Sequence, residues 1–78
     1  MAQAFILVST ELGAEDQVLA EAKEFDVVKE AYVAYGVYDV ILKIQAPSLD
    51  VLKATIIDQV RNLPNVRSTL SMIVVETS

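Results

Sequence analysis

The sequence predicts an α+β protein with the element order β-α-β-β-α-β, and three observations lead to this prediction. Four segments are rich in β-branched and aromatic residues, as strands are. Two further segments carry apolar residues at helical spacing. In the middle of the chain, Tyr35-Gly36-Val37-Tyr38-Asp39 lies between two β-rich stretches and predicts a chain reversal, because glycine reaches positive φ without a steric penalty.

The first half of the chain predicts a strand, a helix and a second strand. Residues 4–10 form the first strand, and Glu11-Leu12-Gly13 turns out of it. Residues 14–25 form the first helix, whose apolar stripe is Val18, Leu19, Ala22 and Phe25. Residues 27–33 form the second strand. At the central turn that follows, we expect the carboxylate of Asp39 to bind nearby backbone N–H groups and hold the reversal tight.

The second half repeats this element order after the reversal. Residues 40–45 form the third strand, and Ser48 is a suitable N-cap for a helix over residues 49–62, which Pro64 ends. One buried face of this helix is predicted at Leu49, Leu52, Ile56, Val60 and Leu63. Residues 67–76 form the fourth strand, in which Leu70, Met72 and Val74 alternate with Thr69, Ser71, Ile73 and Val75.

This order of elements is that of the ferredoxin-like plait, a four-stranded antiparallel sheet with two helices on one face. Both faces of the predicted sheet are apolar: in the first strand, Phe5 and Leu7 oppose Ala4, Ile6 and Val8. The helices cover only one face, and a chain of 78 residues has nothing left to cover the other. We therefore expect a dimer or a higher oligomer.

The composition limits the classes of function. We expect a single domain over residues 1–78, with eleven acidic against six basic residues and a net charge of −5. The cations form no stripe, so we expect no direct binding of nucleic acid. No apolar run approaches the roughly 20 residues that span a bilayer, and the N-terminus lacks the basic residues of a secretory signal. We therefore expect a cytoplasmic protein without a membrane partner.

The residues for catalysis are scarce. The chain has no histidine, cysteine or tryptophan, which removes the commonest general base and the soft metal ligands. Gly13 and Gly36 stand alone, so no phosphate-binding loop is present. We expect no enzyme activity, cofactor or metal. Asp39 is as consistent with a simple turn cap as with a ligand contact. Thr69 and Ser71, taken alone, are ordinary polar residues of a strand. Taken together, these side chains could hold both ends of a zwitterion.

Two motifs resemble the effector domain of the Lrp/AsnC (leucine-responsive regulator) family, also called the RAM domain. Tyr35-Gly36-Val37-Tyr38-Asp39 is similar to that family's Gly-x-Tyr-Asp hairpin, and residues 63–74 to its Leu-Pro-Gly-Val-x-x-Thr-x-Thr segment. Asn65 stands in place of the glycine and Ser71 in place of the second threonine. The family's helix-turn-helix is missing, so the chain resembles a stand-alone form of the domain.

The resemblance implies a dimer formed through the sheet face, further assembly into rings, and binding of small amino acids between dimers. It assigns the ligand role to Tyr35, Gly36, Tyr38, Asp39, Thr69 and Ser71. Two hypotheses remain. The first is an amino-acid-sensing module that acts alone or joins full-length Lrp/AsnC-type regulators. The second is a small dimeric α+β-barrel enzyme whose substrate lies between sheet and helices. The absence of histidine favours the sensor.

Overall fold

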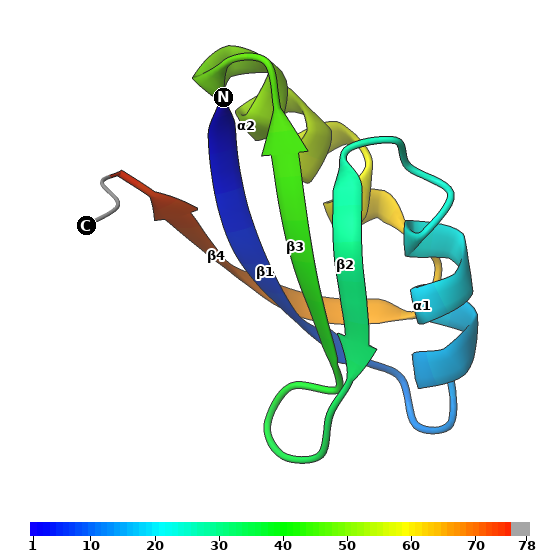
Figure 1. Ribbon diagram of the computed structural model, residues 1–78. Helices are drawn as coiled ribbons and strands as arrows, with labels where there is room; N and C mark the ends of the chain where they lie inside the picture. The colour runs from blue at the N-terminus through cyan, green and yellow to red at the C-terminus, as the bar shows by residue number, and fades with distance from the viewer. Residues whose placement is uncertain (76–78) are drawn as a thin grey trace.

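The elements follow the predicted order (Figure 1). The computed structural model describes residues 1–75. Its helices and strands are β1 (Ala2–Thr10), α1 (Glu15–Ala22), β2 (Val28–Val33), β3 (Val40–Ala46), α2 (Leu49–Asp58), the short 3-10 helix η1 (Val60–Asn62) and β4 (Val66–Val74). Within the described residues, no helix is long and apolar enough to cross a membrane.

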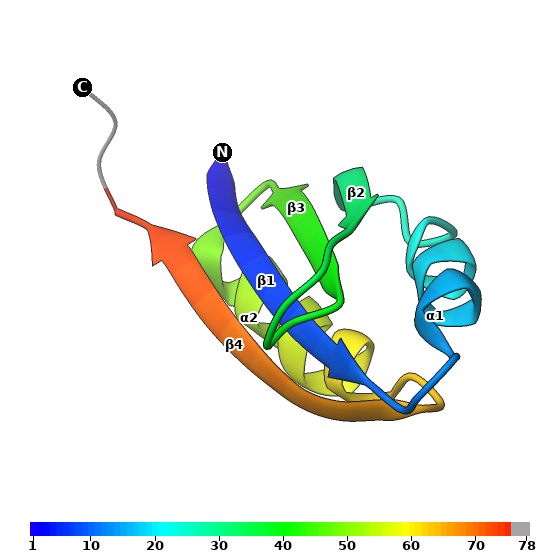
Figure 2. The same ribbon diagram turned by 90° about the horizontal axis from the view of Figure 1, so that it is seen from below.

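The four strands form one antiparallel sheet in the order β2-β3-β1-β4, so β1 and β3 are central. Both helices lie on the same side of this sheet, as Figure 2 shows from below. The register places Ile6 opposite Leu42 on one side and Ser71 on the other. This arrangement confirms the predicted ferredoxin-like plait.

The core lies between the sheet and the helices. Alternate residues of the two central strands are fully buried and point toward the helices: Ala4, Ile6, Val8, Val40, Leu42 and Ile44. The helical side of the core consists of Val18, Ala22, Leu52, Ile56 and Val60. The alternation predicted for the first strand is therefore confirmed, and β3 alternates in the same way, because a strand turns successive side chains to opposite faces.

Both helices end earlier than their apolar spacing predicts. After α1, the N–H groups of Glu24 and Phe25 donate to carbonyls three residues back, at 3.2 and 3.1 Å, so the last turn tightens. Phe25 still packs against the core from this turn. After Asp58, the amide of Asn62 donates to the last carbonyls of α2 and ends that helix. The apolar residues keep their helical spacing beyond the last residue of each helix, so the spacing does not show where α1 and α2 end.

At the start of α2, the predicted burial of Leu49 is wrong and the predicted N-cap is confirmed. Leu49 was predicted to be buried, but it is 44% exposed. It is the first residue of α2 and follows the end of β3 at Ala46 by three residues, so it lies where the chain leaves the sheet. Ser48 is the predicted N-cap, and its hydroxyl accepts a hydrogen bond from the Val51 N–H at 3.2 Å.

The last strand begins at Val66, one residue earlier than predicted, and continues to Val74. The predicted end at Glu76 lies outside the described residues.

We predict that Leu52→Ala and Leu49→Ala have different effects, although both leucines lie on the same predicted stripe. Leu52 is fully buried, so its truncation should lower the free energy of unfolding by about 2–5 kcal/mol. Leu49→Ala should cost less than about 1 kcal/mol, because much of that side chain already contacts solvent. Urea denaturation at one protein concentration measures both values. Equal losses would contradict the observed helix orientation.

Candidate ligand-binding site

The central reversal is a loop of residues 34–39 rather than the tight turn that the sequence predicted. A hydrogen bond from the Ala34 N–H to the Asp39 carbonyl, at 2.8 Å, closes it. Gly36 has a φ of +135°, a value that favours glycine. A two-residue type I′ turn needs two consecutive residues with positive φ, and this loop supplies one, so it is wider.

Asp39 joins this loop to the end of β1. Its carboxylate oxygen Oδ2 accepts hydrogen bonds from the Thr10 N–H at 2.9 Å and from the Thr10 hydroxyl at 3.3 Å. Its own N–H donates to the Val8 carbonyl at 2.8 Å. The carboxylate therefore binds a strand 29 positions away in the sequence, and not the loop's own N–H groups as predicted.

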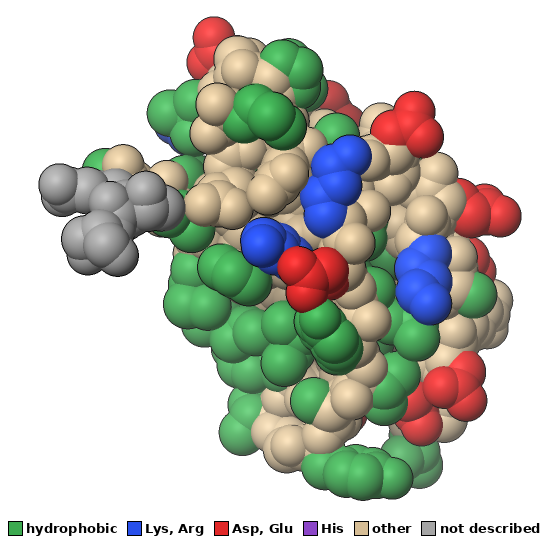
Figure 3. Space-filling view, in the orientation of Figure 1, with side chains coloured by type: hydrophobic (Ala, Val, Ile, Leu, Met, Phe, Trp, Pro, Cys, Tyr) green, Lys and Arg blue, Asp and Glu red, His purple; other side chains and the backbone are tan. Residues whose placement is uncertain are grey.

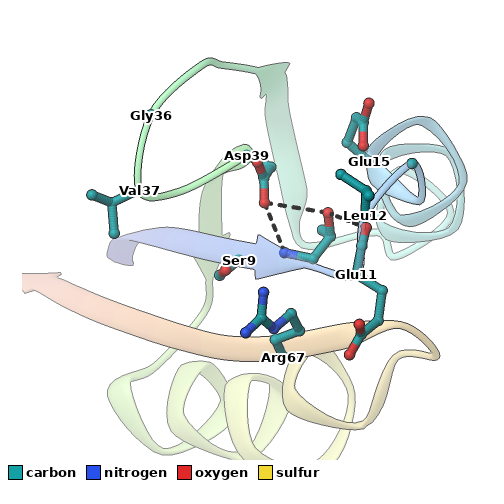
Figure 4. A pocket seen from close by; sticks show the side chains of 10 residues that line it. Ser9, Glu11, Leu12, Glu15, Gly36, Val37, Asp39 and Arg67 are labelled. Carbon is teal, nitrogen blue, oxygen red and sulfur yellow. Dashed lines mark hydrogen bonds between the residues drawn. The ribbon is translucent and has the colours of Figure 1, made fainter.

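A polar cleft of about 210 Å³ opens beside this connection (Figure 4), and we name it the Asp39 cleft. The loop, the end of β1, the following turn and the start of β4 line it. Its residues are Ser9, Thr10, Glu11, Leu12, Gly13, Glu15, Gly36, Val37, Asp39 and Arg67. The volume is below the roughly 300–1,000 Å³ of pockets for drug-sized ligands, so the cleft suits a smaller molecule.

A second cleft, of about 430 Å³, lies on the other side of Asp39. Tyr35, whose side chain is fully exposed, and the first residues of α1 line it. Three of the predicted ligand residues, Tyr35, Gly36 and Asp39, therefore lie around two adjoining clefts. Tyr38 is half-buried in the same loop but lies in neither lining.

The two predicted ligand residues of β4 lie apart from the Asp39 cleft within this chain. Thr69 and Ser71 are opposite Val8 and Ile6, so they are on the helix side of the sheet at its edge. Thr69 lines a separate cleft of about 290 Å³ with Arg61 and Arg67. Neither Thr69 nor Ser71 belongs to the lining of the Asp39 cleft. The structure thus brings Tyr35, Gly36 and Asp39 together around two clefts, and Thr69 and Ser71 lie outside both of these clefts.

Arg67, Glu11 and Glu15 line the Asp39 cleft, and the sequence analysis did not select them. The two glutamates follow from the turn between β1 and α1, which the sequence did predict. Arg67 depends on a register irregularity: Ser9 pairs with Ser68, and Thr10 pairs with Val66. Arg67 is thus the extra residue of a bulge, and a bulge redirects a side chain. No pattern in a single strand indicates such a bulge.

Asn65, which precedes β4, has a φ of +67°. Asparagine tolerates this left-handed conformation better than most residues other than glycine. Its carbonyl accepts a hydrogen bond from the Glu11 N–H at 2.8 Å, and Glu11 is one of the residues that line the Asp39 cleft. The position that resembles a glycine of the family motif therefore has a backbone conformation that glycine also adopts.

A separate polar group lies on the sheet face that the helices do not cover. Lys43 and Glu30 form an ion pair of 3.3 Å there, and the Tyr32 hydroxyl donates to the Glu30 carboxylate. The hydrogen bond from the Tyr32 hydroxyl lowers the pKa of Glu30 below its ordinary value, and Lys43 acts in the same direction. The same carboxylate raises the pKa of Tyr32. This group lies on the opposite side of the sheet from the core and does not line the Asp39 cleft.

The fold and the clefts define the chain as a ferredoxin-like α+β domain with polar clefts at one end of its sheet. A family model described as "Lrp/AsnC ligand binding domain" matches residues 3–78, so the chain belongs to this family. It is 30% identical over 74 residues to the HTH-type transcriptional regulator FL11 of Pyrococcus abyssi. That match covers 95% of this chain and 48% of the regulator, so the chain spans about half of that relative's length.

Two solved structures show the same fold. FFRP-DM1 is 39% identical, with a TM-score of 0.92, and the match covers 96% of this chain and 100% of that one. The transcriptional regulator NMB0573 of Neisseria meningitidis, solved as a complex with L-Met, is 21% identical with a TM-score of 0.83. That match covers 96% of this chain and 50% of the regulator.

We predict that Asp39→Ala lowers the free energy of unfolding by about 1–3 kcal/mol, because it leaves the half-buried donors of Thr10 without their acceptor. Asp39→Asn should cost less than about 1 kcal/mol, since an amide oxygen can still accept from the Thr10 N–H. Urea denaturation measures both changes, with Asp58→Ala on the surface of α2 as the control.

The control should lie within about 0.5 kcal/mol of the parent protein. If Asp39→Ala is as stable as this control, the hydrogen bonds to Thr10 do not hold the loop.

Proposed function

We propose that residues 1–78 form one domain that binds a free amino acid in the Asp39 cleft, and that the domain acts as an oligomeric sensor without catalytic activity. The observation that carries the proposal is a carboxylate that Thr10 fixes in a small polar cleft. Oδ2 accepts both bonds from Thr10, which leaves Oδ1 as an oriented acceptor for a ligand ammonium. Gly36 and Val37 of the loop lie across the cleft from the end of β1 (Figure 4).

The family and its members support this proposal. The family model describes a ligand-binding domain, and FL11 is a transcriptional regulator. The neisserial regulator was solved with L-Met, an amino acid with the ammonium and carboxylate that such a site must hold. Under the proposal, Tyr35 and Tyr38 lie on the loop beside the ligand. Thr69 and Ser71 reach a ligand only from a neighbouring subunit, because their own Asp39 cleft does not include them.

Oligomerisation is the second part of the proposal. The helix-free sheet face carries an apolar patch over β1 and β4, which Figure 3 shows as a group of hydrophobic side chains. The patch consists of Phe5, Leu7, Ile41, Leu70 and Met72, and its polar border is the group of Glu30, Tyr32 and Lys43. A second copy of the chain that packs on this patch would remove it from water.

The proposed partners are further copies of this chain and full-length Lrp/AsnC-type regulators in the cytoplasm. A net charge of −5 gives the chain no strong attraction to phosphates, so we propose that it reaches DNA only through a regulator that carries its own DNA-binding domain.

We predict that at least one of the twenty common amino acids raises the melting temperature of the protein. At about 100 times its dissociation constant, such a ligand should stabilise the folded state by roughly 2.7 kcal/mol. Asp39→Asn should lose this stabilisation, because it removes the charge while it retains the bond to Thr10. Thermal shift, followed by calorimetry on each hit, measures the effect.

Gly36→Val should lose binding too, since its φ of +135° strains any residue with a Cβ. The proposal fails if no amino acid binds below millimolar concentration, or if Asp39→Asn binds as tightly as the parent protein.

We predict that Met72→Glu dissociates the oligomer. Met72 is 46% exposed within the apolar patch, and a buried carboxylate without a partner is costly. Ile57→Glu is the control, because Ile57 is 55% exposed on α2, on the other side of the sheet. Light scattering after size exclusion should give the parent mass for the control and the monomer mass for Met72→Glu. A parent protein that is monomeric at micromolar concentration would contradict the proposal.

A further inference from the structure

We infer that Arg67 binds the carboxylate of the amino acid in the Asp39 cleft, an inference that rests on the proposed function. An amino acid needs hydrogen-bond donors for its carboxylate and acceptors for its ammonium. The sequence analysis expected Thr69 and Ser71 to help hold the two ends of the ligand, and the structure places both residues outside the lining of this cleft. Arg67 is the basic residue in the lining.

The position of Arg67 follows from the bulge between β1 and β4. Ser68 pairs with Ser9, and Val66 with Thr10, so Arg67 is the unpaired residue between them. In a regular strand its side chain would continue the alternation of β4. In the bulge, the side chain lies against the end of β1, and Figure 4 shows the guanidinium below Ser9. The bulge in the main chain therefore holds the Cα of Arg67 beside the Asp39 cleft.

Arg67 shares the cleft with carboxylates but does not pair with them. Throughout residues 1–75, the structure records one ion pair, between Lys43 and Glu30 on the other side of the sheet. The guanidinium and the carboxylate of Asp39 thus belong to the same small cleft and are separated by more than the length of an ion pair. Under the inference, the carboxylate of a zwitterion binds Arg67 and its ammonium binds Asp39.

The remaining charges define the chemical class of the ligand further. Glu11 and Glu15 add two carboxylates to the lining, so the cleft as a whole is acidic and Arg67 is its one basic side chain. A guanidinium binds a carboxylate with two parallel hydrogen bonds, and no other side chain in the lining can do so. The class is therefore α-amino acids with a free carboxylate, and α-amides or decarboxylated amines should bind less well.

The test compares each of the twenty common L-amino acids with its α-carboxamide by calorimetry, for the parent protein, Arg67→Gln, Arg67→Lys and Arg61→Gln. Arg61 lines the neighbouring cleft with Thr69 but not the Asp39 cleft, so Arg61→Gln is the matched control. For any amino acid that binds the parent, Arg67→Gln should reduce the preference for acid over amide by about tenfold or more. The preference of Arg67→Lys for acid over amide should lie between those of the parent protein and Arg67→Gln, since lysine keeps the charge and loses the two parallel hydrogen bonds.

The affinity for the α-carboxamide should be the same in Arg67→Gln and the parent protein, which separates a lost contact from a damaged fold. The inference is overturned if an amino acid binds the parent and Arg67→Gln keeps the full preference for the acid, or if Arg61→Gln loses it equally. If no amino acid binds the parent protein at all, the proposed function fails and this assignment fails with it.

Discussion

The hydrogen bonds from Thr10 to the carboxylate of Asp39 are the constraint on which the loop of residues 34–39 and the Asp39 cleft depend. They connect the loop of residues 34–39 to a central strand, and the bond from the Asp39 N–H to Val8 repeats the connection through the main chain. Without the side-chain bonds, the loop would be held by two main-chain bonds, Ala34–Asp39 and Asp39–Val8, and by its flanking strands. With them, the walls of the Asp39 cleft have fixed positions. A ligand that binds there has less loop entropy to remove, which favours a small molecule with few contacts.

The same end of the sheet combines three irregular features. Gly36 and Asn65 have positive φ, and the register of β1 and β4 shifts by one residue after Ser9. Each feature departs from regular structure at some cost, and the core does not require any of them. Gly36 and Arg67 both line the Asp39 cleft, and Asn65 binds the main chain of Glu11, which lines it too. Irregular backbone that converges on a polar cleft is typical of sites that bind ligands.

The sequence predicted the fold because the core depends on short-range patterns. The alternation of Ala4, Ile6 and Val8 and the helical spacing of Val18 and Ala22 follow from local geometry alone. The site was predicted less completely. The loop residues were found because a lone glycine marks a reversal, but the partner of Asp39 and the redirected Arg67 depend on how distant strands align. The burial of Leu49 was predicted wrongly for a related reason, since helical spacing does not show where the sheet ends.

A titration followed by NMR tests the central claim most directly. The amino acid with the largest effect on the melting temperature would be added to ¹⁵N-labelled protein, and the backbone amide signals recorded at each step. The account predicts that the signals of Thr10, Gly36 and Asp39 shift together along one binding curve, while that of Ile57 on α2 stays in place. Shifts centred on Thr69 and Ser71, with Thr10, Gly36 and Asp39 unchanged, would contradict it.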